Sequence, residues 1–202
     1  MHKKLINKFF KEIAEVTETP SAAALANFQI KLLINKGGEE VTEMLNDVVF
    51  SKNPTRKEEA LAQREEIQSM TCEQLIKLMR GKCDPANQAV LVERATEFEG
   101  ELIPEVIRMY KRSLNTDFIE TSARVLSACS LDIGDELVEC FDEIRSPYAQ
   151  SVILVVLGFK ADEKHIPWLI EKYSEFKRKY PDELYHDGAY YAISEIEERF
   201  YL

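Results

Sequence analysis

The chain has 202 residues, of which 45% are hydrophobic and 31% charged, so it is long enough to bury a core and too apolar to be disordered. Its longest apolar run, residues 152–159, is far shorter than the roughly 20 residues that span a bilayer, and the first residues contain no secretory signal. We therefore expect a cytoplasmic protein without a membrane segment. The net charge of −10 argues against nucleic acid as a partner, because an acidic surface repels phosphate groups.

The chain reads as a succession of helices, because no stretch alternates apolar and polar residues as a strand does. Proline follows a capping side chain at several predicted helix starts, as in Asn53-Pro54 and Ser146-Pro147. The pattern predicts an all-α protein with helices near residues 2–17, 20–35, 38–50, 55–69, 71–81, 85–98, 101–113, 116–130, 133–144, 147–158, 163–179 and 183–201.

Five of these helices share one register of apolar residues. Ile103, Ile107 and Tyr110 occupy positions i, i+4 and i+7, which lie on one helical face. The same spacing starts again at residues 41, 72, 133 and 166, so the pattern recurs every 30 to 33 residues. Such a period predicts a repeat in which each registered first helix is followed by a second helix.

The second helix that contains residues 151–158 is apolar on every side. A helix of this kind must be covered on every side, so it is expected to have neighbours above and below it. A stack of helical pairs meets that requirement, whereas an isolated hairpin does not.

Several of these segments resemble the HEAT-repeat family of α-solenoids. The resemblance rests on Leu102-Ile103-Pro104 and His165-Ile166-Pro167 at the starts of first helices, and on Ala123-Arg124 within a second helix. It implies a right-handed α-α superhelix, of the HEAT or armadillo kind, formed by about five helical pairs in a single domain over residues 1–202. Residues 1–37 would form an N-terminal pair of capping helices and residues 38–202 the repeats. The resemblance also implies a concave surface, formed mostly by second helices, that binds other proteins.

Acidic and aromatic residues are concentrated toward the C-terminus. Residues 101–150 hold 5 basic and 10 acidic side chains, residues 151–202 hold 7 and 10, and ten of the 19 aromatic residues lie in the last 44. On the final helix, Tyr191 is predicted to face away from the apolar stripe, among Asp187, Glu195 and Glu198. A tyrosine in acidic surroundings suits a basic, partly apolar surface, so these four are the candidate partner-binding residues. The alternative is that the aromatic residues pack the end of the fold.

The sequence supplies no constellation for catalysis, for a metal or for a cofactor. It lacks nucleophile and phosphate-loop motifs, and its three histidines show no metal-ligand spacing. His186 with Asp187 could approach Asp162 and His165 across the last hairpin, but solvated caps are the simpler interpretation. Of the four cysteines, Cys72, Cys129 and Cys140 are predicted in the core and Cys83 in an accessible turn, and nothing in the sequence indicates whether it is reactive.

These observations predict a non-enzymatic scaffold or adaptor that binds a basic protein through an acidic, aromatic surface in its C-terminal half. The alternative is a HEAT-like enzyme of the alkylpurine DNA glycosylase type. That function requires a basic groove, for which the sequence offers only scattered candidates such as Arg124. The sequence identifies neither the partner nor the oligomeric state.

Overall fold

The computed structural model of the chain describes residues 2–14, 54–84 and 87–202. Within these ranges it contains ten α-helices, two short 3-10 helices and no strand, which confirms the all-α class. None of the described helices is long and apolar enough to cross a membrane. The chain divides into two compact units, of which unit 1 combines Met1–Phe28 with Asp132–Leu202 and unit 2 is Gln29–Leu131.

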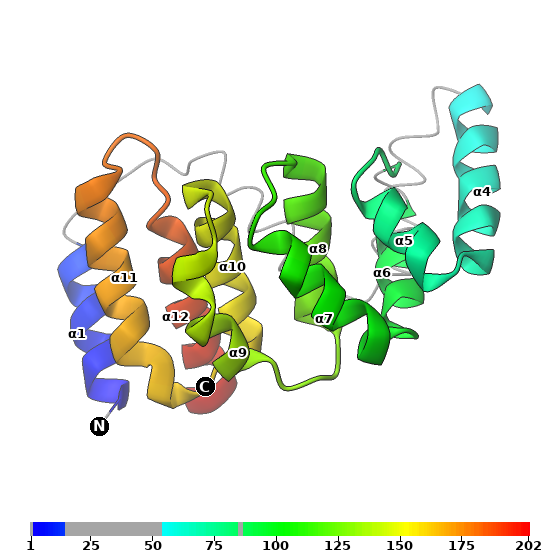
Figure 1. Cartoon of the computed structure of the whole chain (residues 1–202). Coiled ribbons are helices and arrows are strands. Elements are labelled where there is room, and N and C mark those ends of the chain that lie inside the picture. Colours follow the sequence, from blue (N-terminus) through cyan, green and yellow to red (C-terminus); the bar gives the residue numbers. More distant parts are fainter. Residues whose placement is uncertain (1, 15–53, 85–86) are drawn as a thin grey trace. The chain divides into compact units, whose positions relative to one another are not determined.

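Unit 2 contains five described helices, α4 to α8. α6 packs on both α4 and α8, while α5 packs on α7 (Figure 1). The helices are α4 (Pro54–Ser69), α5 (Cys72–Met79), α6 (Gln88–Thr96), α7 (Glu99–Tyr110) and α8 (Thr116–Ala128).

Side-chain caps set the starts of two helices in unit 2. The Thr71 hydroxyl accepts a hydrogen bond from the backbone N–H of Gln74, and the Gln74 side chain accepts one from the Thr71 N–H at 2.9 Å. The Asn115 carboxamide oxygen accepts from the N–H of Phe118 at 2.9 Å. These caps satisfy N–H groups that have no partner within the first helical turn, so α5 and α8 begin close to the predicted positions.

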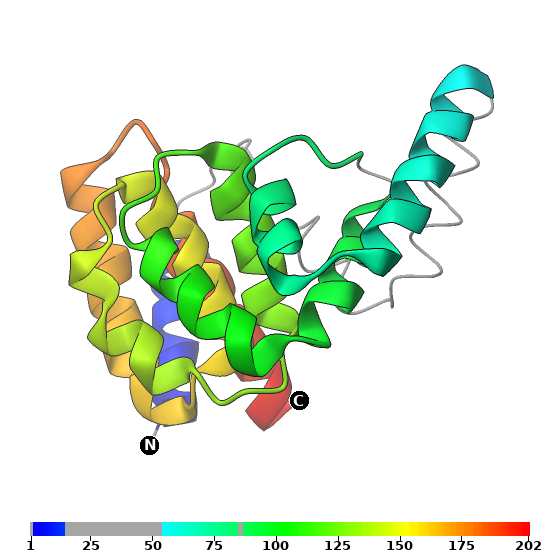
Figure 2. The ribbon, with the colours of Figure 1, turned by 45° about the vertical axis from the view of Figure 1, so that its right-hand side comes forward.

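Unit 1 is built around α10 and α12, which pack against each other (Figure 2). α10 begins at Pro147, as predicted, and the Ser146 hydroxyl accepts a hydrogen bond from the N–H of Ala149. α9 packs on α10, and α11 packs on α12. The elements of this unit are α1 (His2–Ala14), α9 (Gly134–Glu139), η2 (Phe141–Glu143), α10 (Pro147–Lys160), η3 (Glu163–His165), α11 (Ile166–Lys179) and α12 (Asp187–Tyr201).

Glycine permits the close approach of α10 and α12. A Cβ atom added at Gly188 would lie 2.1 Å from the carbonyl oxygen of Ser151, and one at Gly158 would lie 3.0 Å from the Cα of Ala192. Every residue from 151 to 158 is buried, as the all-round apolar sequence predicted. The two helices therefore pack backbone to backbone along much of their length.

The predicted register largely matches the observed burial. The frame at residue 41 lies outside the described residues, and the other four fall on α5, α7, α9 and α11. In α5 and α11 the middle residue, Ile76 or Ile170, is only half-buried, and its neighbour Leu75 or Leu169 is fully buried instead. In α7 and α9 all three register residues are buried: Ile103, Ile107 and Tyr110 in the one, and Ile133, Leu137 and Cys140 in the other.

α1, the described part of the predicted N-terminal cap, packs against the last two helices of the chain (Figure 1). The Phe9 ring meets Tyr173 of α11 edge to face with centroids 5.0 Å apart, and Phe10 meets Tyr190 of α12 in the same way at 5.5 Å. The first helix of the chain thus covers its last helical pair. The rest of the cap, up to residue 37, lies outside the described residues.

Candidate functional site

The four partner-binding residues predicted on α12 differ in their exposure. Glu198 is exposed, Tyr191 is half-buried with its ring edge to face against Tyr190, and the Asp187 side chain is 21% exposed and lies 3.7 Å from the His186 imidazole. Glu195 is only 7% exposed. The expectation that all four share one solvent-facing surface is therefore wrong at Glu195.

Two faces of α12 are covered, which explains the burial of Glu195. α12 packs on both α10 and α11, and the side chain of Glu195 lies with Ala192 against α10, where Gly158 leaves room for it. A Cβ atom at Gly158 would lie 3.0 Å from the Cβ of Glu195. Helical periodicity identifies the most apolar face of a helix, but it does not reveal how many neighbours cover the helix.

An acidic surface lies on α9 and η2. The buried residues Ile133 and Leu137 hold α9 against the rest of unit 1. The carboxylates of this segment lie on its exposed side. The segment from residue 132 to 143 contains no lysine or arginine. All six of its acidic residues are exposed, and we call them the α9 acidic face: Asp132, Asp135, Glu136, Glu139, Asp142 and Glu143.

One carboxylate of the α9 acidic face is paired with the start of α11. Asp135 accepts a hydrogen bond from the Lys164 ammonium at 2.7 Å and lies 2.9 Å from Nε2 of His165. The hydrogen bond from Lys164, reinforced by His165, lowers the pKa of Asp135, and the same bond raises the pKa of Lys164. Asp135 is therefore ionised over the whole neutral range.

A second carboxylate, Asp142, is paired with Lys172 of α11. The Lys172 ammonium lies 3.3 Å from Asp142 and 3.1 Å from Glu175, over the rings of Phe141 and Trp168. Burial opposes the charge on Lys172, but the hydrogen bonds to Glu175 and Asp142 outweigh it and raise the pKa of the lysine. By contrast, the Glu136 and Glu139 carboxylates have no partner among the described residues.

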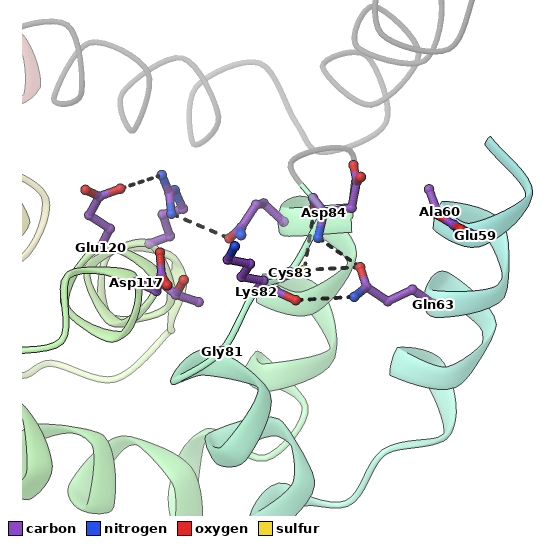
Figure 3. Close-up of a pocket in the computed structure, with 12 residues that line it drawn as sticks. Glu59, Ala60, Gln63, Gly81, Lys82, Cys83, Asp84, Asp117 and Glu120 are labelled. Carbon is purple, nitrogen blue, oxygen red and sulfur yellow. Dashed lines mark hydrogen bonds and ion pairs between the residues drawn. The ribbon is translucent and has the colours of Figure 1, made fainter. Parts of the chain in front are cut away.

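Unit 2 contains a polar pocket with a volume of about 670 Å³. Side chains of α4 line one side and side chains of α8 the other, and the loop between α5 and α6 forms its floor (Figure 3). The lining residues are Glu59, Ala60, Gln63, Gly81, Lys82, Cys83, Asp84, Gln88, Asp117, Glu120, Thr121 and Arg124.

Two carboxamides fix the α4 side of this pocket. The Gln63 oxygen accepts from the Asp84 N–H at 2.9 Å, while the Gln63 amide donates to the carbonyl oxygen of Lys82 (Figure 3). The Gln63 oxygen also accepts from the Asn87 amide at 3.0 Å. Asn87 is fully buried and also donates to the carbonyl oxygen of Ala60 at 2.8 Å. The loop is thereby tied to α4 by hydrogen bonds rather than by apolar contact.

Arg124 and Glu120 form the α8 side of the pocket. The guanidinium lies 3.6 Å from the Glu120 carboxylate, one turn earlier on the helix, and donates to the Gln88 carboxamide oxygen at 3.5 Å. Among the described lining residues, Arg124 and Lys82 are the two cationic ones against four carboxylates, and none has an aromatic ring. Arg124 therefore belongs to an acidic pocket and not to a basic groove.

Cys83 is the most accessible of the four cysteines, as predicted, since Cys72, Cys129 and Cys140 are buried. Its thiol lies 3.8 Å from the Gln63 oxygen. Burial, and to a smaller extent the negative charge of Asp84, raises the pKa of Cys83 to about 12. The positive charge of Arg124 acts in the opposite direction but has a smaller effect. The thiol is neutral at physiological pH, so it lacks the thiolate that nucleophilic chemistry requires.

The histidines make separate contacts and do not converge. His186 is buried with its ring against Tyr173, whereas Nδ1 of His165 accepts from the Asp162 N–H and its Nε2 faces Asp135. His2 lies 3.7 Å from Glu163. In the part of the chain that the structure describes, no three His, Cys, Asp or Glu side chains are grouped as a metal ion requires.

The sequence predicted an acidic surface in the C-terminal half but not its position on α9, and it did not indicate the pocket. The candidate binding residues were placed on α12, whereas the six exposed carboxylates lie at helical spacing opposite Ile133 and Leu137. The pocket had no such signal. Gln63 and Asn87 are 24 residues apart and lie on different elements.

Protein-family models, curated proteins and solved structures yield no match to this chain. The likeness to HEAT repeats therefore rests on the residues quoted for it.

Proposed function

We propose that this protein is a cytoplasmic, non-enzymatic interaction scaffold that binds a basic protein partner through the α9 acidic face. The observation that carries this proposal is the exposure of all six carboxylates between Asp132 and Glu143, in a segment without a basic residue. A field of one sign attracts a partner of the other sign and speeds its association.

The packing of α9 fixes the position of its acidic face, which favours binding of a partner. Ile133, Leu137 and Cys140 are buried on one side of the helix, so the carboxylates are presented on a fixed backbone. The pairs Asp135 with Lys164 and Asp142 with Lys172 restrict two of the side chains as well. A preorganised surface loses less conformational entropy when a partner binds.

The proposed architecture is a right-handed superhelix of about five helical pairs. Its support is the packing inside each unit, where α6 contacts α4 and α8, and where α12 covers the fully buried α10. Stacked pairs expose one edge of each first helix, and α9 is such a first helix. The residues predicted on α12 then have a smaller share in binding, limited to the exposed Glu198 and the half-buried Tyr191.

The alternative of a DNA glycosylase receives less support from the geometry. Such an enzyme needs a groove that attracts phosphate and stacks a flipped base. The described residues that line the pocket around Arg124 offer four carboxylates and no aromatic ring. Salt-sensitive binding of duplex DNA in a mobility-shift assay would favour the alternative.

The test of the scaffold compares two variants that remove the same charge. One is Asp132→Asn, Glu136→Gln and Glu139→Gln on the α9 acidic face. The other replaces three exposed carboxylates of unit 2, Glu65, Glu66 and Glu73, by glutamine. Native cell extract is passed over each immobilised protein, and bound proteins are identified and quantified at two salt concentrations.

We expect a basic protein on the wild type and on the unit 2 variant, reduced about tenfold on the α9 variant and released by added salt. Equal capture by both variants, or capture of acidic proteins alone, would show that the α9 acidic face is not the binding surface.

A further inference from the structure

We propose that the polar pocket of unit 2 is a second binding site, which takes an alkyl cation ending in a guanidinium or primary ammonium group. The site is formed by α4, α8 and the loop between α5 and α6, and it shares no residue with the α9 acidic face. It therefore goes beyond the scaffold function and is tested separately.

Apart from the exposed Lys82 ammonium, several hydrogen-bond donors on or beside the pocket walls are used within the protein. The Gln63 amide donates to the Lys82 carbonyl, and the Asn87 amide donates to the Ala60 carbonyl and to Gln63. The Arg124 guanidinium is directed to Gln88 and Glu120. A ligand that depends on donors from the protein, such as a phosphate or carboxylate, finds few of them here.

Acceptors remain on two facing walls. Glu59 on α4 and Asp117 on α8 are exposed lining residues, and their carboxylates have no hydrogen-bond or ion-pair partner among the described residues (Figure 3). Because these two helices pack on opposite sides of α6, the two carboxylates approach the pocket from different directions. A ligand with several N–H donors and a positive charge matches that arrangement.

Size and lining define the ligand further. A volume of about 670 Å³ lies within the range of pockets for small molecules and has room for a long side chain. Because the described lining residues include four carboxylates and no aromatic ring, we expect the pocket to hold a cation by charge-assisted hydrogen bonds rather than by stacking. Because the pKa of the Cys83 thiol is about 12, binding does not involve covalent attachment to this cysteine.

Two sources can supply this chemistry, a free amine or an arginine side chain of a peptide. Agmatine, with a guanidinium at one end and an ammonium at the other, is the probe for the first. A fluorescent twelve-residue peptide of alternating arginine and glycine is the probe for the second. Calorimetry for agmatine and fluorescence anisotropy for the peptide give Kd for the full chain.

The pocket variant is Glu59→Gln with Asp117→Asn, and its control is Glu66→Gln with Glu73→Gln, which removes two exposed carboxylates of unit 2 outside the pocket. Circular dichroism and thermal unfolding verify that both variants are folded. Because the Glu59 and Asp117 side chains form no hydrogen bond or ion pair with a described residue, the pocket variant should keep the fold.

We expect at least one probe to bind the wild type and the control alike, and to bind the pocket variant about tenfold or more weakly, because two charge-assisted hydrogen bonds are lost. Binding of agmatine alone identifies a small amine as the ligand, and binding of the peptide alone identifies a basic segment. The inference is wrong if neither probe binds, or if the pocket variant and its control bind equally. Neither of these results bears on the α9 acidic face.

Discussion

Unit 1 and unit 2 are both helical, yet different contacts hold their helices together. In unit 1, α10 and α12 approach through Gly158 and Gly188 until their backbones nearly touch, and the residues between 151 and 158 are all buried. In unit 2, the loop before α6 is tied to α4 by the carboxamides of Gln63 and Asn87. In unit 1 close backbone packing is supplemented by hydrogen bonds from Arg199 of α12 to the carbonyl oxygens of Gly158 and Ala161. In unit 2, at this point, directional hydrogen bonds from carboxamides hold the loop.

The two units also present different candidate binding surfaces, an exposed acidic face in unit 1 and a polar pocket in unit 2. In unit 1 the close approach of α10 and α12 builds the interior, and the acidic surface lies outside, on α9. In unit 2 hydrogen bonds tie the α5–α6 loop to α4, and a polar pocket lies between α4, this loop and α8. Buried carboxamides are favourable only when they are fully hydrogen-bonded, so both the loop and the pocket depend on that network.

The strongest challenge to the close packing of unit 1 is Gly188→Ala. The added methyl group would lie 2.1 Å from a backbone oxygen of α10, which cannot move aside as a flexible side chain can. We expect a loss of about 3 kcal/mol in the free energy of unfolding, measured by urea denaturation.

Gly100→Ala is the matched control, because Gly100 also lies in the first turn of a helix but has no heavy atom within 4 Å of the added Cβ. It should be neutral or stabilise by up to about 1 kcal/mol, since alanine favours the helix. Similar losses in both variants would show that helix propensity, and not the close approach, limits position 188.

The corresponding change in unit 2 is Asn87→Ala. Asn87 is fully buried, and the substitution removes the hydrogen bonds that its amide donates to the Ala60 carbonyl oxygen and to the Gln63 side-chain oxygen. We expect a loss of about 2 kcal/mol in the free energy of unfolding and faster hydrogen exchange at the amides of residues 81–84. Gln68→Ala, at an exposed position of α4, serves as the control. Unchanged exchange in the loop would mean that the carboxamides do not hold it.

The pH dependence of the free energy of unfolding tests whether the Cys83 thiol is desolvated in the pocket. Its pKa is raised in the folded state to about 12 from an ordinary value of 9.0. The thiol therefore contributes stability that is complete below pH 9 and is lost as the pH rises from 9 toward 12, because the unfolded chain ionises first. The free energy of unfolding should fall by about 1 kcal/mol more between pH 8 and pH 10 in the wild type than in Cys83→Ala. Parallel pH curves for the two proteins would show that the thiol is not desolvated.

The fold was predictable where local sequence determines structure. Ile103, Ile107 and Tyr110 repeat at the helical period, so their burial followed from spacing, and Ser146 before Pro147 marked the start of α10. Glu195 was misassigned because its burial depends on a glycine of another helix, 37 positions earlier in the chain.

The candidate sites were less accessible to prediction than the fold. The acidic face of α9 follows from the same period as the core, so it could have been identified from the sequence. The pocket could not, because its walls come from α4, the following loop and α8, and because the partners of Gln63 are set by tertiary packing. Local patterns predict which face of a helix is buried, whereas a pocket requires the positions of several elements.

The smallest expected effect concerns Asp135, on the surface of unit 1, and it has the opposite sign to that of Cys83. Because the hydrogen bond from Lys164 lowers the pKa of Asp135, the pair contributes stability above the ordinary pKa of 3.8, and that stability is lost as the pH falls through the lowered value. In Lys164→Gln the pKa of Asp135 should rise part of the way back, since His165 at 2.9 Å still favours the carboxylate. Carboxyl-carbon NMR titration measures this shift, with Lys77→Gln as a control of equal charge on unit 2. An Asp135 pKa that is the same in both variants would assign the shift to His165 and not to Lys164, so that Asp135 of the α9 acidic face would be held by His165 alone.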